Sequence, residues 1–191
     1  MDPATINLPS WEPTKCSVRE NGCITGYAAN TNQGIIRDYN EDRVSIVLNI
    51  MQPPSKKDVE NWPKCSFFGV FDGHGGNTCA DFLRDNLHQF IIKDSNFPKN
   101  PRQAIINGYK KAENYFLDTV ESFAAGRQHM LDRSGSCAIV ALLFEKRVFV
   151  VNVGDSRAIL SCDGGNYCIN LSLDHKPNED FEQNRILDKG E

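Results

Sequence analysis

One segment of the 191-residue sequence combines residue types that could hold a metal ion: Phe71-Asp72-Gly73-His74-Gly75-Gly76. It ends a compact apolar run, residues 65–71, that is typical of a buried strand. Glycines let the backbone approach a bound group, and an aspartate beside an exposed carbonyl offers two hard oxygen ligands to Mg²⁺ or Mn²⁺. A tight turn leading into a helix explains the segment equally well when it is taken alone.

A second candidate segment, Arg37-Asp38-Tyr39-Asn40-Glu41-Asp42, lies between turn residues and a predicted strand. Glu41 and Asp42 point to opposite faces of an extended chain, so one can bind a metal while the other orients water from behind. Arg37, four residues before Glu41, has a planar guanidinium that suits phosphate oxygens. Taken alone, the segment is more simply explained as a solvated run of charges at a strand entry.

Two later segments place charged residues in loops. Residues 152–158 interrupt two apolar strands with Asp155, a serine and an arginine, which is ordinary composition for a hairpin turn. Residues 173–177 read Leu-Asp-His-Lys-Pro and are also typical of a loop. Neither segment indicates a function by itself.

Together the segments resemble one family, the metal-dependent protein serine/threonine phosphatases of type 2C. The order, the spacing and the flanking strands all match. The similar segments are residues 37–42, 70–76, 134–138, 152–158 and 173–177, and the resemblance extends from about residue 24 to residue 191.

The resemblance implies a metal site for Mg²⁺ or Mn²⁺. Asp72 would bridge two ions, Glu41 and the carbonyl of Gly73 would complete their coordination, and Asp42 would hold metal-bound water. A third, weaker ion in the family is linked to the position of Asp155.

The resemblance also implies a reaction, the hydrolysis of phosphoserine and phosphothreonine in phosphorylated proteins. In the family's scheme a hydroxide between the ions is the nucleophile, because the metals lower the pKa of bound water. Arg37 would clamp the phosphate, and His74 would be the general acid that protonates the departing alkoxide.

Two features depart from the family pattern. Cys137 stands where the family usually has a small hydroxyl residue. The family's two further metal-binding aspartates, in Asp-Gly and Asp-Asn elements, have no match downstream of Lys176. We therefore expect the N-terminal portion of a type 2C domain, weakly active or inactive alone, whose full-length parent is the enzyme. The alternative is a non-catalytic phosphatase-like scaffold or interaction module.

Periodicity predicts the elements that must position these segments. Short strands are expected at residues 23–28, 44–50 and 65–71, followed by helices starting near Asn77 and Pro101. An antiparallel meander over residues 136–161 and a helix behind Pro177 complete the order. This order predicts an α+β fold, and the resemblance implies a β-sandwich of two antiparallel sheets flanked by helices, with its C-terminal part missing. Residues 1–22 are expected to form an extended arm, and residues 23–191 an incomplete phosphatase-like domain.

Composition excludes several classes of protein. Lys and Arg number 21 against 25 Asp and Glu, so the net charge of −4 argues against nucleic-acid binding. The seven cysteines form an odd set without a C-x-x-C pair, which fits free thiols in a reducing compartment, the cytoplasm and also the nucleus. No apolar run approaches the roughly 18 residues of a membrane span. The sequence is silent on oligomeric state.

Overall fold

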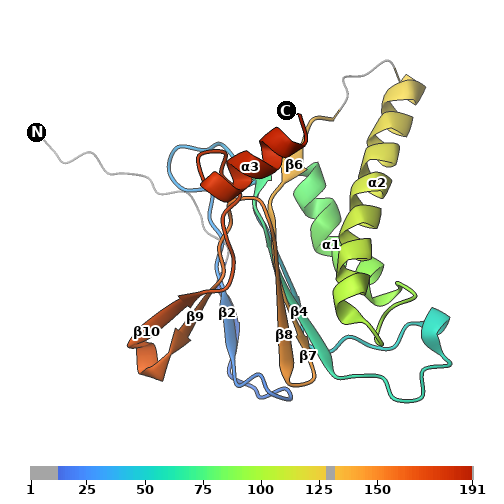
Figure 1. Cartoon of the computed structure of the whole chain (residues 1–191), viewed down its shortest axis with the longest axis vertical. Coiled ribbons are helices and arrows are strands. Elements are labelled where there is room, and N and C mark those ends of the chain that lie inside the picture. The colour runs from blue at the N-terminus through green and yellow to red at the C-terminus, as the bar shows by residue number, and fades with distance from the viewer. Residues whose placement is uncertain (1–12, 128–131, 191) are drawn as a thin grey trace, which may run out of the picture.

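The computed structural model describes residues 13–127 and 132–190. It confirms the α+β class, with antiparallel strands and three α-helices (Figure 1). The strands are β1 (Lys15–Ser17), β2 (Tyr27–Ala29), β3 (Arg43–Val47), β4 (Cys65–Phe71), β5 (Gly73–His74), β6 (Gly135–Ser136), β7 (Ala138–Phe144), β8 (Arg147–Val153), β9 (Ile159–Cys162) and β10 (Tyr167–Asn170). The helices are α1 (Thr78–Ile92), α2 (Pro101–Arg127) and α3 (Asp180–Asp188), with 3₁₀ turns at Pro54–Lys56 and Asp163–Gly165.

The central layer is a four-stranded antiparallel sheet in the order β3-β4-β7-β8. Side chains alternate between its faces, so Phe67 and Phe71 of β4 point to the core and are fully buried, whereas Val70 is 43% exposed on the other face. The apolar run of residues 65–71 predicts a buried strand. In β4 that burial is complete on the face that carries the helices and partial on the other face.

Helices α1 and α2 cover this core face (Figure 1). Leu87 and Ile91 of α1 and Ala104 and Ala112 of α2 join the buried cluster with the sheet. The two helices approach closely at Gly108, where an added Cβ would lie 2.6 Å from Ile91 Cγ1 and 3.0 Å from its Cα. The predicted apolar stripes are therefore core faces.

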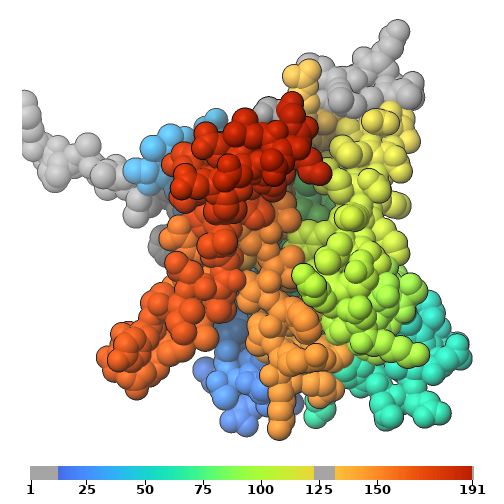
Figure 2. All heavy atoms as spheres, in the orientation of Figure 1, coloured from blue at the N-terminus to red at the C-terminus, as the bar shows by residue number. Residues whose placement is uncertain are grey.

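The other face carries two small hairpins. Strands β1 and β2 pair with each other, and β9 pairs with β10 around the predicted Asp-Gly-Gly-Asn turn. Figure 2 shows the β9–β10 hairpin standing out from the body of the molecule. The expected meander therefore ends at β8, because β9 leaves the central sheet and takes β10 as its partner instead of β8.

Helix boundaries differ from the sequence-based expectation by one or two residues. Asn77 precedes α1 but its side chain makes no capping hydrogen bond, and Glu179, not Asn178, occupies the N-cap of α3. Helix α2 continues through Gly126 to Arg127, so that glycine does not end it. Residues 1–12 of the expected arm lie outside the described residues, whereas part of its remainder forms β1. Among the described residues, no helix has the length and apolar composition needed to cross a membrane.

Candidate metal and phosphate site

Asp72 stands at a junction where the central sheet ends. It directly follows β4, and the next two residues form β5, which pairs with β6. The carbonyl of Asp72 accepts a hydrogen bond of 2.9 Å from the backbone N–H of Cys137. This bond fixes the backbone of Asp72 while leaving its carboxylate exposed.

Gly73 brings the second predicted segment against Asp72. Gly73 is buried, and a Cβ at this position would collide with the backbone carbonyl of Glu41. The backbone N–H of Gly76 donates a 2.6 Å hydrogen bond to Glu41 Oε1. Glycines in this turn thus allow the contact that places Glu41 beside the Asp72 segment, whereas the sequence pattern predicts only that they let the backbone approach a bound group.

Arg37 reaches outward from the same segment. Its Nη1 lies 3.8 Å from Glu41 Oε2, and the Arg37 side chain is 75% exposed whereas that of Glu41 is only 13% exposed. Tyr39 Oη, at 3.5 Å, is a further partner of Glu41 Oε1. The guanidinium is therefore near the carboxylates and still open to a ligand from solvent.

Asp42 is a partly buried carboxylate that lies close to other carboxylates. Burial and then the charge of Asp72 raise the pKa of Asp42, while a backbone hydrogen bond from Gly73 and the charge of Arg43 oppose that shift. Like charges raise a carboxyl pKa when they share a small volume, and a cation there relieves the repulsion.

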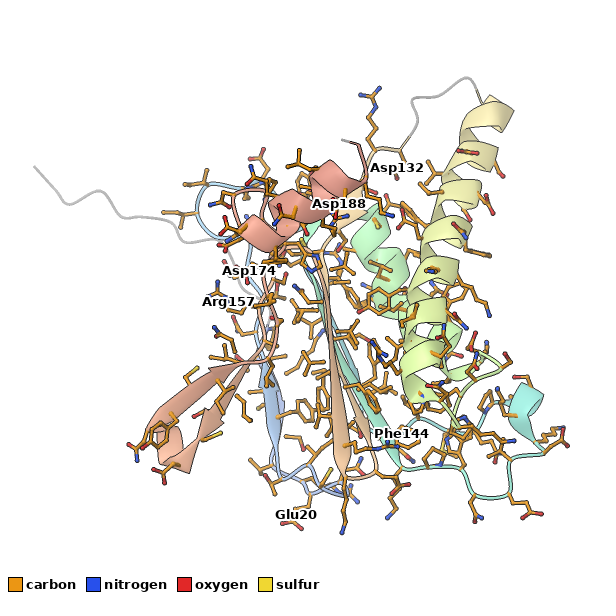
Figure 3. The ribbon with its side chains drawn as sticks, viewed as in Figure 1. Glu20, Asp132, Phe144, Arg157, Asp174 and Asp188 are labelled. Atoms are coloured by element: carbon orange, nitrogen blue, oxygen red, sulfur yellow. The ribbon has the colours of Figure 1, made fainter. Side chains whose placement is uncertain are left out.

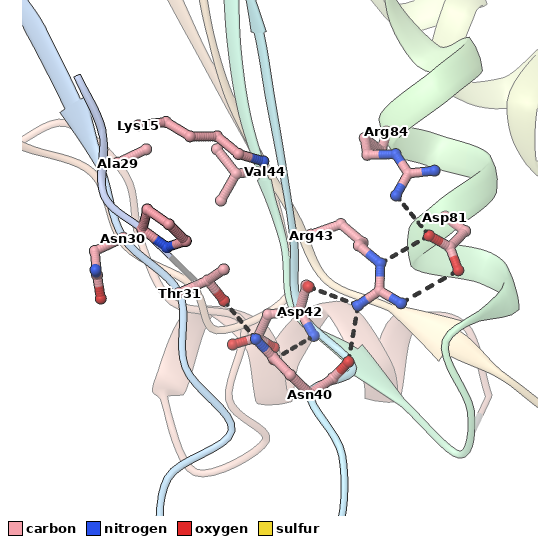
Figure 4. Close-up of a pocket in the computed structure, with 11 residues that line it drawn as sticks. Lys15, Ala29, Asn30, Thr31, Asn40, Asp42, Arg43, Val44, Asp81 and Arg84 are labelled. Atoms are coloured by element: carbon pink, nitrogen blue, oxygen red, sulfur yellow. Dashed lines mark hydrogen bonds and ion pairs between the residues drawn. The ribbon is translucent and has the colours of Figure 1, made fainter. Parts of the chain in front are cut away.

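Arg43, which sequence reasoning did not single out, fastens this segment to α1 (Figure 4). Its Nε donates to Asp81 Oδ1 at 2.7 Å, and its Nη1 donates to the carbonyls of Asn40 and Asp42 at 2.8 and 2.9 Å. Arg84 also pairs with Asp81 at 2.8 Å. The only sequence signal was an Arg at a strand start and an Asp in the first turn of a helix, a common combination.

Asp155 comes from the loop after β8 and meets the Asp72 region through Cys137. The Cys137 thiol donates to Asp155 Oδ1 at 3.5 Å, and Asp72, Cys137 and Asp155 each offer one ligand atom within 4.8 Å of the others. Burial, with the charges of Asp155 and Asp72 adding to it, raises the pKa of Cys137, whereas the backbone N–H of Asp155 opposes the shift. The sequence identified Cys137 as a departure from the family but not as a member of this cluster.

Residues 173–177 support the Asp155 loop. Arg157 forms a two-pronged pair with Asp174, at 3.0 and 2.7 Å, which lowers the pKa of Asp174 to about 2 (Figure 3). The backbone N–H of His175 donates to the carbonyl of Gly154 at 2.9 Å, and Asn152 Nδ2 donates to the carbonyls of Gly154 and Leu173. These contacts hold residues 173–177 against the loop that carries Asp155.

His74 lies on β5, two residues after Asp72, with an exposed side chain. Its ring packs against Gly135 of β6 so closely that a Cβ on Gly135 would collide with the imidazole. The backbone pairing of β5 with β6 thus sets where the imidazole stands.

The donor set has the chemistry that hard divalent ions require. Carboxylates from three chain segments converge on a turn whose glycines expose backbone, and oxygen ligands of this kind suit Mg²⁺ and Mn²⁺. The residues therefore fit a divalent metal site with an arginine at its edge.

Comparisons with known proteins agree with this arrangement. The family model described as Protein phosphatase 2C matches residues 29–191. Probable protein phosphatase 2C 52 of Oryza sativa subsp. japonica is 41% identical over 125 residues, covering 65% of this chain and 24% of that protein. Probable protein phosphatase 2C 56 of the same organism is 33% identical over 186 residues, covering 93% of this chain and 48% of that protein.

Among solved structures, the serine-threonine phosphatase 2C of Toxoplasma gondii aligns with a TM-score of 0.59 and 26% sequence identity, covering 81% of this chain and 51% of that one. The chain thus spans about half, or less, of the length of these relatives.

Proposed function

This chain belongs to the protein phosphatase 2C family, and from that premise we propose that the whole protein hydrolyses phosphoserine and phosphothreonine in phosphorylated proteins, in a metal-dependent reaction. The observation that carries the proposal is the convergence of carboxylates from separate segments around the Asp72-Gly73 turn, with Arg37 at its edge.

The proposed metal ligands are Asp72, Glu41 and the carbonyl of Gly73, with Asp155 as the ligand of a further ion. Mg²⁺ or Mn²⁺, when bound, supplies positive charge for the phosphate and activates water for attack on phosphorus. Asp42, which the charge of Asp72 reaches, orients water from behind the other ligands.

Arg37 and His74 perform the remaining tasks in this proposal. The exposed Arg37 guanidinium binds two phosphate oxygens and holds the phosphoryl group in place. His74, held beside the site by the β5–β6 pairing, carries a proton on its imidazole and gives it to the departing serine or threonine oxygen. A basic leaving group such as a serine or threonine alkoxide needs this proton, whereas a weakly basic leaving group does not.

The proposal includes an intracellular location, in the cytoplasm and also the nucleus. Its support is that all seven cysteines are free thiols, as expected in a reducing compartment.

Phosphate release from a phosphothreonine peptide, measured on this chain and on the protein at its native length, tests the proposal. We expect Mn²⁺-dependent release at native length that a chelator abolishes and Mn²⁺ restores. Asp72→Asn should lower it by about 100-fold or more, because even outer partners of metal ligands typically cost 10–100-fold. Asp118→Asn, an exposed residue of α2, is the matched control and should keep full activity.

The role of His74 has its own test. His74→Asn should slow hydrolysis of the phosphopeptide far more than hydrolysis of p-nitrophenyl phosphate, whose leaving group needs no proton. Equal loss on both substrates would contradict the general-acid role. An absence of metal-dependent turnover at native length would refute the phosphatase proposal and favour a scaffold. Turnover that survives Asp72→Asn unchanged would contradict the proposed metal site.

A further inference from the structure

Cys137 adds a sulfur atom to the carboxylates of the candidate metal site. One ligand atom from each of Asp72, Cys137 and Asp155 lies within 4.8 Å of the other two, and the Cys137 Sγ to Asp155 Oδ1 distance is 3.5 Å. Asp72 directly follows β4, Cys137 joins β6 to β7, and Asp155 lies in the loop after β8. Their convergence is therefore a product of the fold and not of sequence proximity.

The backbone holds the sulfur in this position. The N–H of Cys137 is bonded to the carbonyl of Asp72 at 2.9 Å, and the backbone N–H of Asp155 is bonded to the Cys137 side chain. Gly154, at φ +106°, packs so tightly on Cys137 that a Cβ there would collide with Sγ and lie 3.2 Å from Cys137 Cα. The thiol is thus confined between the two aspartate-bearing segments.

The separations suit a tetrahedral ion that accepts both oxygen and sulfur. Bond lengths of about 2.3 Å to sulfur and about 2.1 Å to oxygen place tetrahedral S and O ligands roughly 3.6 Å apart. The observed 3.5 Å between Cys137 Sγ and Asp155 Oδ1 already matches that value. The other ligand pairs lie within 4.8 Å, and both aspartates are exposed.

We propose that Asp72, Cys137 and Asp155 form an oxygen–sulfur–oxygen site that binds Zn²⁺, with water completing the tetrahedron. The metal replaces the proton of the Cys137 thiol, which passes to solvent. Thiolate is a good ligand for Zn²⁺ and a poor one for Mg²⁺, so the cysteine shifts the preference of this part of the site toward thiophilic ions. The inference rests on the proposed function in one respect, since Asp72 and Asp155 are also proposed ligands of the catalytic ions.

The test uses Co²⁺ as a spectroscopic substitute for Zn²⁺ on the 191-residue chain. A thiolate bound to Co²⁺ gives a charge-transfer band in the near ultraviolet. We expect this band in the unmodified protein, its loss on adding Zn²⁺, and its absence in Cys137→Ser. Cys168→Ser, which removes an exposed thiol of β10, is the matched control and should keep the band.

Zn²⁺ affinity, measured by competition with a chromophoric chelator, gives the second readout. Cys137→Ser should weaken Zn²⁺ binding by at least about tenfold, while Mg²⁺ affinity stays unchanged. Asp155→Asn should weaken Zn²⁺ binding with the thiol still in place, and circular dichroism confirms that each variant is folded. A band that persists in Cys137→Ser, or equal Zn²⁺ affinity with and without the thiol, overturns the proposal.

Neither readout depends on catalysis. A cobalt band in the 191-residue chain, together with no metal-dependent phosphatase activity in the protein at its native length, supports the zinc site and refutes the proposed function. Phosphatase activity at native length without a cobalt band in the 191-residue chain supports the proposed function and refutes the zinc site.

Discussion

At the scale of single residues, the site depends on glycines as much as on carboxylates. Gly73 lets the backbone of Glu41 come into contact with the Asp72 turn, and Gly154 lets the side chain of Cys137 lie beside Asp155. The sequence indicated that the backbone at the first position can be closely approached, because three glycines follow Asp72 within four positions, but it predicted a bound group there and not Glu41. It gave no sign of the second, since a Gly-Asp pair between two strands is equally typical of an ordinary turn.

Gly154→Ala should therefore be strongly destabilising. The residue has φ +106°, a backbone conformation that strains an L side chain by about 1–2 kcal/mol. The added Cβ would also collide with Cys137, and overpacking of this kind typically costs about 1–3 kcal/mol. We expect the free energy of unfolding, measured in urea, to fall by about 2–5 kcal/mol.

Gly164→Ala is the control for the strain alone. Gly164 also has a positive φ, +64°, but no atom lies within 4 Å of its added Cβ. This variant should lose only about 1 kcal/mol. Equal losses in the two variants would show that contact with Cys137 does not constrain Gly154.

At the scale of elements, a buried charge joins the end of α1 to α2 and to the 51–63 connection. Asp94 is 2% exposed and accepts hydrogen bonds from the backbone and side chain of Asn96, from Asn107 and, at 3.0 Å, from Lys111. Lys56, from the 3₁₀ turn of the connection, donates to the carbonyls of Asp94 and Phe97. Burial alone would raise the pKa of Asp94, but these donors outweigh it and hold that pKa well below its usual range.

Asp94→Asn should lower stability by about 2 kcal/mol at neutral pH, because it removes charge-assisted hydrogen bonds in a buried setting. A carboxyl whose pKa is lower in the folded state stabilises the fold above its unfolded pKa of about 4, and this contribution is lost as pH falls toward the folded value. The difference in melting temperature between the unmodified protein and the variant should therefore be full above about pH 5 and shrink as the pH falls below 4.

Asp85→Asn, on helix α1, provides the comparison. Asp85 pairs with Arg84 at 2.7 Å but its side chain is 59% exposed, so the loss should be below about 1 kcal/mol. A pH-independent difference for Asp94→Asn would contradict an ionised Asp94 in the fold.

The sequence predicted the elements that are marked by a local pattern, such as an apolar run or a glycine-rich turn. It did not predict which strands pair with each other. Strand β4 matches the predicted residues 65–71 because an apolar run ends sharply at Asp72, and the β9–β10 turn follows from its glycines. Nothing local in residues 157–161 distinguishes pairing with β8 from pairing with β10. That choice depends on contacts such as Arg157 with Asp174, which lie 17 residues apart.

At the scale of the whole molecule, the central sheet is covered unequally. Its core face is closed by α1 and α2, whereas the opposite face borders an apolar cavity of about 250 Å³ that is also lined by β2 and by Arg157 and Ala158, just before β9. Residues that line it include Tyr27, Ile46, Phe68, Val70, Ile139 and Ala141. Contiguous exposed apolar surface of this kind binds apolar molecules from solution.

The 191-residue chain should therefore bind an apolar fluorescent dye while fully folded. Val70→Lys places a charge at the edge of the cavity, where Val70 is 43% exposed, and should reduce dye fluorescence without loss of the circular dichroism signal. Val148→Lys is the matched control, since Val148 is 57% exposed on β8 and is not among the cavity-lining residues. Its dye signal should equal that of the unmodified protein. Equal fluorescence in all three proteins would show that the dye binds elsewhere, because a lysine beside the cavity must disturb any ligand held there by apolar contact.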